Sequence, residues 1–119
     1  INHCREMPLA YSLSDVVVSA SIEPEAFGRV AVESQAMGKP IIASNIGGSK
    51  ETVLNKKSGF LYKHDDPREL AKNLNTVIQL NQEELKLMGN EGRKNVTKKF
   101  DVDLMCDSNL REYKKLLVK

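Results

Sequence analysis

Aromatic residues are scarce in this sequence of 119 residues, at 5%, and tryptophan is absent. Any hydrophobic core must therefore be built from aliphatic side chains. Charge of one sign is also lacking, because 18 Lys and Arg residues face 16 Asp and Glu residues, for a net charge of +2. Such a balance provides no basic stripe for nucleic acid, so we expect no nucleic-acid partner. With 40% apolar residues and little net charge, the composition also excludes a disordered chain.

Cysteine and long apolar runs are lacking too. The two cysteines, Cys4 and Cys106, lie far apart, which favours reduced thiols in a cytoplasmic protein over a disulfide framework. No run reaches the roughly 18 apolar residues of a membrane-spanning helix, and the first residues lack the pattern of a signal peptide. We therefore expect a cytoplasmic protein. Because the first residue is Ile1 and not Met, we also expect a piece of a longer chain.

Strands and helices alternate along the sequence. Short apolar and β-branched runs predict strands at residues 15–20, 41–43 and 59–62. Apolar residues at helical spacing predict helices at residues 8–14, 27–37, 49–54, 67–78, 82–96 and 102–117. This order is typical of a parallel α/β sheet. Three strands would leave two exposed sheet edges, so we expect further strands upstream or a partner that covers them.

Several helix ends carry recognisable signals. Asp66, which precedes a proline, is the expected N-cap of one helix, and Asn81 begins a capping box with a glutamate three residues later. Ser49 is the expected N-cap of the short helix at residues 49–54. Gly89 and Gly92 weaken their helix by about 1 kcal/mol each against alanine. Such glycines often allow two backbones to pack closely.

The stretch at residues 21–33 holds the candidate site. Its loop leaves the carboxyl end of a predicted strand, where ligands of open parallel sheets bind. Gly28 then opens a helix, whose free N–H groups and partial positive charge suit a diphosphate. Glu33, in the second turn, could accept two hydrogen bonds from a ribose cis-diol, and Glu25 could accept bonds from sugar hydroxyls. Taken alone, this pattern favours solvated surface carboxylates, so the neighbouring sequence has to decide.

That neighbouring sequence points to one family. Residues 25–33 resemble the E-x7-E motif of family 4 glycosyltransferases, with its Phe-Gly pair in place. Residues 33–44 are similar to the family's EA-A-GxPVxA segment, although Ser34 stands where alanine is usual. In the same register, residues 47–53 resemble GGxxExV, and residues 59–61 and 66–71 resemble the GfLv and D…LA blocks. The resemblance covers nearly the whole chain.

The resemblance implies the GT-B architecture, in which two Rossmann-like domains face a cleft. Residues 1–119 would be the C-terminal part of the nucleotide-sugar-binding domain, a three-layer α/β/α structure with a parallel sheet. The helix within residues 101–119 would pack towards an N-terminal domain that the chain lacks. The acceptor domain, its Gly-rich loop and the basic pair that holds the donor diphosphate would all lie upstream. We therefore expect the chain alone to be inactive.

The resemblance also implies roles for individual residues. Glu33 would hold the ribose hydroxyls of the donor, and Glu25, the candidate catalytic residue, would contact hydroxyls of the transferred sugar. The backbone N–H groups near the sugar and diphosphate would be those of Phe27, Gly28, Arg29 and Val30. Gly47 and Gly48 would border the donor site, although a simple tight loop explains them equally well.

The chemistry implied by the family is sugar transfer with retention, by front-side attack of an acceptor hydroxyl. It requires no cofactor and no metal held by an Asp-x-Asp motif, and this sequence has no such motif; His3 and His64 lack metal-spaced companions. The donor would be a UDP-, GDP- or ADP-sugar. The acceptor would be a glycan or lipid, as in cell-envelope polysaccharide synthesis. Lys94, Lys98 and Lys99 form a solvated face or a weak contact with the inner face of an anionic membrane.

Three alternatives stay open. The chain could be a non-catalytic module that binds nucleotide-sugars. It could belong to a GT-B-like enzyme of another reaction type, such as a nucleotide-sugar epimerase or a phosphorylase. It could also be a structural α/β domain that binds no nucleotide.

Overall fold

A three-stranded parallel sheet lies at the centre of the molecule. The structure is a computed structural model that describes residues 4–118. The strands β1 (Val17–Ser19), β2 (Ile41–Ser44) and β3 (Gly59–Tyr62) follow one another in the order β1-β2-β3. Val17 is paired with Ile41, and Ile41 with Gly59, so the two pairings share one register. The expected parallel sheet is confirmed.

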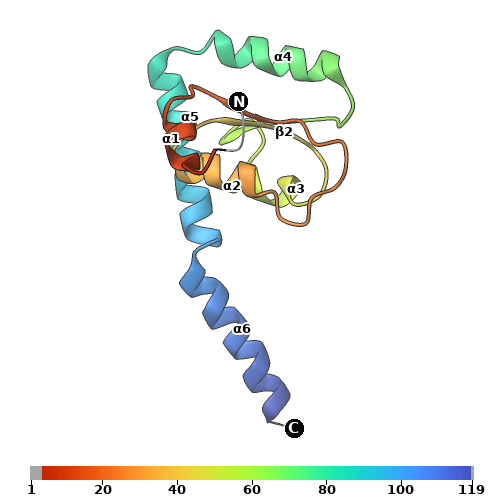
Figure 1. Ribbon diagram of the computed structural model, residues 1–119, viewed down its shortest axis with the longest axis vertical. Helices are drawn as coiled ribbons and strands as arrows, with labels where there is room; N and C mark the ends of the chain where they lie inside the picture. Colours follow the sequence, from red (N-terminus) through yellow and green to blue (C-terminus); the bar gives the residue numbers. More distant parts are fainter. Residues whose placement is uncertain (1–3, 119) are drawn as a thin grey trace.

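Helices cover both faces of this sheet. The helices of the described chain are α1 (Met7–Ser12), α2 (Arg29–Ala36), α3 (Ser49–Thr52), α4 (Pro67–Ile78), α5 (Gln82–Lys99) and α6 (Val102–Leu117), of which α6 lies away from the sheet (Figure 1). In Figure 1, α4 lies above the sheet, α2 and α3 lie below it, and α5 runs along its side. The result is the three-layer α/β/α arrangement that the sequence predicts.

The core has two parts, one on each side of β2. On one face, Ile41 and Ala43 pack with Ala31 of α2 and with Val53. On the other face, Ile42 packs with Tyr62 of β3 and Val77 of α4. All four residues of β2 are buried, as expected for a central parallel strand with both faces covered.

Two of the predicted helix caps are confirmed and one is wrong. The Asp66 side chain accepts hydrogen bonds from the backbone N–H groups of Arg68 and Glu69, at 3.1 and 3.0 Å. Asn81 and Glu84 form the expected capping box, with N–H···O distances of 2.8 and 2.9 Å. Ser49, by contrast, is the first residue of α3 and not its N-cap. The N-cap is Gly48, because its carbonyl already accepts from the N–H of Thr52.

Two predicted elements begin later than expected. The strand expected at residues 15–20 is limited to Val17–Ser19, because its partner strand starts only after Pro40, which has no N–H to donate. The helix expected from Phe27 starts at Arg29. Its N-cap is Gly28, whose φ of +77° lies in the left-handed region and cannot continue a helix backwards.

Helices α2 and α5 approach each other closely. A Cβ atom on Gly89 would overlap with the backbone carbonyl of Gly38, just after α2, and one on Gly92 would lie 3.0 Å from the Gln35 side chain. In the same interface, the Gln35 and Asn95 side chains both donate hydrogen bonds of 2.9 Å to the carbonyl of Thr52. The expectation that these glycines allow close packing is confirmed.

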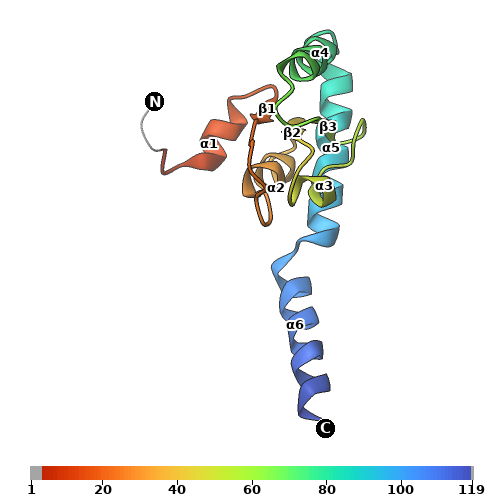
Figure 2. The same ribbon diagram turned by 90° about the vertical axis from the view of Figure 1, so that its right-hand side faces the viewer.

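Helix α6 projects away from the rest of the molecule. Figures 1 and 2 show it extending in the direction of the long axis, beyond the end of α5, and all its residues are exposed. Its exposed apolar side chains include Leu104, Met105, Leu110, Tyr113 and Leu117. Among the described residues, no helix combines the length and apolar character needed to cross a bilayer.

Candidate functional site

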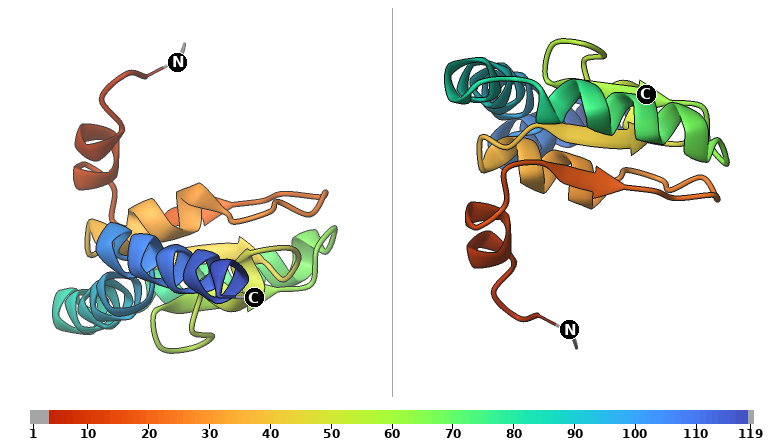
Figure 3. Two further views of the ribbon diagram at one scale, coloured as in Figure 1. Left: turned by 90° about the horizontal axis from the view of Figure 1, so that it is seen from below. Right: turned by 90° about the horizontal axis from the view of Figure 1, so that it is seen from above.

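The loops that follow β1 and β2 lie at the same end of the sheet. Figure 3 shows the strands running in one direction, with the segment before α2 extending past their carboxyl ends. The N–H of Gly48, in the loop after β2, donates a hydrogen bond of 2.8 Å to the carbonyl of Glu25, in the loop after β1. The two loops are therefore joined through their backbones.

Gly47 and Gly48 make this close approach feasible. A Cβ atom on Gly47 would overlap with the backbone of Glu25, and one on Gly48 would overlap with the backbone of Phe27. Any larger residue would thus push the two loops apart. Both glycines lie beside the loop of Glu25, and the prediction that they border the donor site stays a prediction.

Phe27 and Gly28 lead from this loop into α2. The ring of Phe27, which is 44% exposed, meets Phe100 edge to face, with 5.4 Å between the ring centres. Gly28 is buried, and its φ of +77° turns the chain into the helix. Among residues 4–118, no side chain caps this end of α2, so its first N–H groups have no side-chain acceptor.

Glu25 is held on its own loop. Its Oε1 accepts a hydrogen bond of 2.5 Å from the Ser21 hydroxyl, and the side chain is exposed. This contact fixes the direction of the carboxylate within the loop after β1. It leaves the second oxygen available to a hydroxyl-bearing ligand.

The side chain of Glu33, a residue of α2, reaches α1. Its Oε2 accepts a hydrogen bond of 2.9 Å from the hydroxyl of Tyr11 on α1. Its Oε1 lies 3.1 Å from the guanidinium of Arg29, one turn earlier on α2. The carboxylate thus has one partner on each oxygen, and it remains 35% exposed.

Tyr11 is the buried partner in this group. Burial, reinforced by the hydrogen bond to Glu33 and the negative charge of that carboxylate, raises the pKa of Tyr11 from 10.0 to about 12. The raised pKa means that the folded protein favours the neutral phenol. As a consequence, the Tyr11 hydroxyl acts as a donor to Glu33.

A pocket of about 450 Å³ opens beside these three residues, between α1 and α2. Its polar lining comes from Arg5, Tyr11, Arg29 and Glu33, and its apolar lining from Met7, Pro8, Ala36 and Met37. A pocket with one apolar wall and a few converging polar groups suits a flat, partly polar ligand. The Glu33 carboxylate gives it a strong hydrogen-bond acceptor.

The structure brings some of the predicted residues together and keeps others apart. Arg29 and Glu33 share the pocket and an ion pair, whereas Glu25 contributes nothing to the lining of that pocket. Sequence reasoning missed Tyr11 and Ser21, which hold the two carboxylates. No local pattern signalled Tyr11, because its contact with Glu33 joins residues 22 positions apart and depends on how α1 packs against α2.

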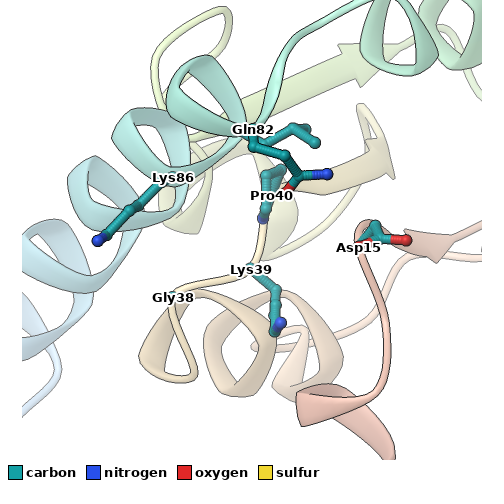
Figure 4. Close-up of a pocket in the computed structure, with 7 residues that line it drawn as sticks. Asp15, Gly38, Lys39, Pro40, Gln82 and Lys86 are labelled. Atoms are coloured by element: carbon teal, nitrogen blue, oxygen red, sulfur yellow. The ribbon is translucent and has the colours of Figure 1, made fainter.

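A second pocket lies at the opposite end of the sheet. It has a volume of about 300 Å³ and is lined by Asp15, Gly38, Lys39, Pro40, Gln82, Leu85 and Lys86. Asp15 precedes β1 and Pro40 precedes β2, so this pocket faces the amino ends of the strands. Figure 4 shows the amino groups of Lys39 and Lys86 pointing in different directions. Ligands of open α/β sheets bind at the other end, so we do not place the site here.

Metal-binding chemistry finds no support in the described part of the chain. Among residues 4–118, no three His, Cys, Asp or Glu side chains lie close enough together to hold a metal ion. His3, whose role as a ligand was considered above, lies outside the described residues. Cys4 and Cys106 are both free thiols.

The chain is similar to known proteins over most of its length. Residues 2–95 match the profile of the family described as "Glycosyl transferases group 1". Spore coat protein SA of Bacillus subtilis strain 168 is 30% identical over 112 residues, which cover 93% of this chain and 29% of that protein. The chain therefore spans less than a third of this relative.

Solved structures share the fold. A glycosyltransferase from Rickettsia africae is 40% identical, with a TM-score of 0.85 over 91% of this chain and 29% of that one. HepE from Anabaena, solved with UDP and with UDP-glucose, is 28% identical, with TM-scores of 0.88 and 0.86. Each HepE match covers 94% of this chain and 30% of that one. The expected fold class, part of the C-terminal domain of the GT-B architecture, is confirmed.

Proposed function

This chain belongs to the group 1 glycosyl transferases, and from that premise we propose that the complete protein transfers a sugar from a nucleotide-sugar to an acceptor. We assign the protein to family 4 and these residues to its donor-binding half. The observation that carries the proposal is the position of Glu33. Its carboxylate faces a pocket between α1 and α2, in the E-x7-E register with Glu25.

The ribose of the donor binds to Glu33. A carboxylate has room for about four hydrogen bonds, two on each oxygen. Tyr11 occupies one position on Oε2 and Arg29 one position on Oε1, so each oxygen retains one for a ribose hydroxyl. The apolar wall at Met7, Pro8, Ala36 and Met37 then accommodates the base. The UDP complexes of HepE support a UDP-sugar, with GDP- and ADP-sugars as the other candidates.

The diphosphate and the sugar lie towards the carboxyl ends of the strands. The N–H groups of Phe27, Gly28, Arg29 and Val30 stabilise the diphosphate, since the amino end of a helix attracts negative charge. Glu25 accepts bonds from the sugar hydroxyls, and we assign it as the catalytic residue of this half. Gly47 and Gly48 hold the Glu25 loop in place through their contacts with its backbone.

Transfer proceeds with retention of the anomeric configuration. The acceptor hydroxyl attacks the anomeric carbon on the face that the diphosphate leaves, and its proton passes to the departing diphosphate. As the bond to the diphosphate breaks, negative charge grows on its oxygen. Preorganised amide dipoles at the start of α2 stabilise this charge, which lowers the barrier. The reaction requires no cofactor and no metal ion.

The acceptor binds to an N-terminal domain beyond these residues. We propose that the apolar face of α6 packs on that domain, and that the chain of residues 1–119 alone is inactive. The acceptor is a glycan or a lipid. The similarity to a spore coat protein supports a role in building the cell envelope. We further propose that the protein works in the cytoplasm, at the inner face of the membrane. Lys94, Lys98 and Lys99 at the end of α5 provide positive charge for that contact.

Substitution of Glu33 tests the donor site. In the complete protein, Glu33→Ala is expected to weaken binding of the preferred nucleotide among UDP, GDP and ADP by about 1–3 kcal/mol, measured by isothermal titration calorimetry. Glu91→Ala is the matched control, because Glu91 is also a helical glutamate paired with a cation, Lys94, at 3.5 Å. An unchanged affinity in Glu33→Ala would contradict the assignment.

Product analysis separates the remaining alternatives. With UDP-glucose and a glycan acceptor, transfer predicts a new glycosidic bond with retained configuration and the release of UDP. An epimerase would yield an isomeric nucleotide-sugar, and a phosphorylase would require inorganic phosphate. Binding without turnover would indicate a non-catalytic module.

A further inference from the structure

Tyr11 is the one residue of α1 that is buried, at 5% exposure, while Leu9 on the same helix is 55% exposed. A short surface helix would normally turn its aliphatic side chain inwards. Here the phenol is turned inwards instead, with its hydroxyl 2.9 Å from Glu33 Oε2. This packing places a polar group against the carboxylate on which ribose recognition depends.

The two partners of Glu33 differ in how firmly they hold it. The side chain of Arg29 is 84% exposed, and exposed ion pairs within one helix contribute little and are screened by salt. Tyr11 belongs to another helix and is anchored by its buried ring, so its hydroxyl has few alternative positions. The orientation of the carboxylate is therefore set by Tyr11 more than by Arg29.

Orientation matters because a cis-diol presents two hydroxyls with a fixed spacing. Both carboxylate oxygens have to face them at once for two hydrogen bonds to form. The phenol is neutral at pH 7, and its hydroxyl donates to Oε2 of Glu33. Because Tyr11 and Glu33 both line the pocket, the bond from the phenol to Oε2 holds the carboxylate at the pocket wall.

We propose that Tyr11 is a positioning residue for ribose recognition, whose hydroxyl orients the Glu33 carboxylate towards the two hydroxyls of the nucleotide ribose. The inference rests on the proposed function of Glu33 and adds a residue from a separate helix. It predicts that the preference for ribonucleotides over deoxyribonucleotides depends on the Tyr11 hydroxyl.

The test uses the complete protein and the ratio of two dissociation constants, that of 2′-deoxy-UDP to that of UDP, measured by calorimetry. Tyr11→Phe keeps the buried ring and removes the hydroxyl. We expect this variant to lower the ratio by about threefold to tenfold. Without the bond from Tyr11, the Glu33 carboxylate loses a well-formed hydrogen bond to a ribose hydroxyl. Tyr62→Phe, at a second buried tyrosine that packs with Ile42 and Val77 in the core, is the matched control and should leave the ratio unchanged.

A ratio in Tyr11→Phe equal to that of the unsubstituted protein would overturn the inference, even if both affinities fell. A merely structural role would weaken both nucleotides alike, whereas a positioning role weakens UDP more. Glu33→Gln distinguishes the two levels of the argument. If it leaves the ratio unchanged, the ribose role of Glu33 fails and this inference fails with it. If it lowers the ratio and Tyr11→Phe leaves the ratio unchanged, only the inference about Tyr11 fails.

A second measurement needs no variant at Tyr11. In the unsubstituted protein with ¹³C at the tyrosine ring carbon that bears the hydroxyl, UDP should shift the Tyr11 resonance more than 2′-deoxy-UDP does. The resonance is assigned by its change in Glu33→Gln, at a partly exposed position. Equal shifts with both nucleotides would overturn the inference, whether or not Tyr11→Phe folds.

Discussion

At the scale of single residues, Gly48 lies directly against the backbone of the loop that follows β1. An added Cβ would overlap with the backbone of Phe27, so Gly48→Ala has to displace one of the two loops. We expect it to lower the free energy of unfolding by about 1–3 kcal/mol, as overpacking does. Urea unfolding followed by circular dichroism measures this.

Gly38→Ala is the control for Gly48→Ala. Gly38 has a positive φ of +69°, whereas Gly48 has an ordinary helical φ of −61°, and an added Cβ on Gly38 would have open space around it. Its substitution should carry only the backbone penalty and should leave UDP affinity unchanged. Gly48→Ala should weaken UDP as well, since the loop of Glu25 and Phe27 moves. Equal UDP affinity in the two variants would contradict this account.

Tyr11 also gives the stability of the protein a dependence on pH. Its folded-state pKa is about 12, against 10.0 for an ordinary tyrosine, so folding favours the neutral phenol. The resulting stabilisation is fully present below pH 10 and is lost as the pH rises towards 12. We expect the free energy of unfolding to fall less steeply over this range in Tyr11→Phe.

The comparison of slopes is made by urea unfolding at several pH values. Some decline should persist in the variant, because burial also raises the pKa of Tyr62. Identical slopes in Tyr11→Phe and the unsubstituted protein would show that the Tyr11 phenol ionises equally readily in both states.

At the scale of elements, the helix caps differ in what they support. Asp66 caps α4, which packs on the sheet through Val77, whereas Asp101 caps α6, whose residues are all exposed. We expect Asp66→Ala to lower the free energy of unfolding by about 1 kcal/mol. Asp101→Ala should reduce only the helix signal of α6. Chemical denaturation with far-ultraviolet circular dichroism checks both, and equal losses of stability would contradict this distinction.

Elements that depend on local contacts could be predicted from the sequence, and features that depend on distant contacts could not. The caps Asp66 and Asn81 are local signals, because each side chain bonds to backbone within three residues, and their helices were predicted with the correct starts. The start of β1 depends on the start of its partner strand β2, which follows Pro40. The sequence around β1 alone could therefore not define its limits. The contact between Tyr11 and Glu33 joins residues 22 positions apart, which no periodicity reveals.

For the candidate site, the family resemblance supplied the residues and the structure supplied their partners. Glu25 and Glu33 could be selected from the E-x7-E spacing. Their surroundings depend on how the chain packs. Glu25 is bonded to Ser21 on its own loop, whereas Glu33 lines a pocket between two helices. Their roles in donor binding stay predictions for the experiments above.

At the scale of the whole molecule, α6 extends well beyond the sheet and the helices that cover it (Figure 1). The molecule measures 56 × 31 × 28 Å, and α6 extends along its longest dimension without covering the core. A helix of 16 residues that packs on nothing is marginal in water. Its apolar side chains are therefore expected to find a partner surface in the complete protein, for which we propose the N-terminal domain.

Amide hydrogen exchange tests that arrangement. In the chain of residues 1–119 alone, amides of α6 should exchange rapidly, because the helix opens without disturbing the core. In the complete protein the same amides should be protected by at least about tenfold, as expected for a gain of about 1.4 kcal/mol or more from packing. Amides of β2 serve as the internal reference, since that strand is buried on both faces and should exchange slowly in both forms. Equal exchange of α6 in the two forms would mean that the helix remains free in the complete protein, and its apolar face would then have to bind something else.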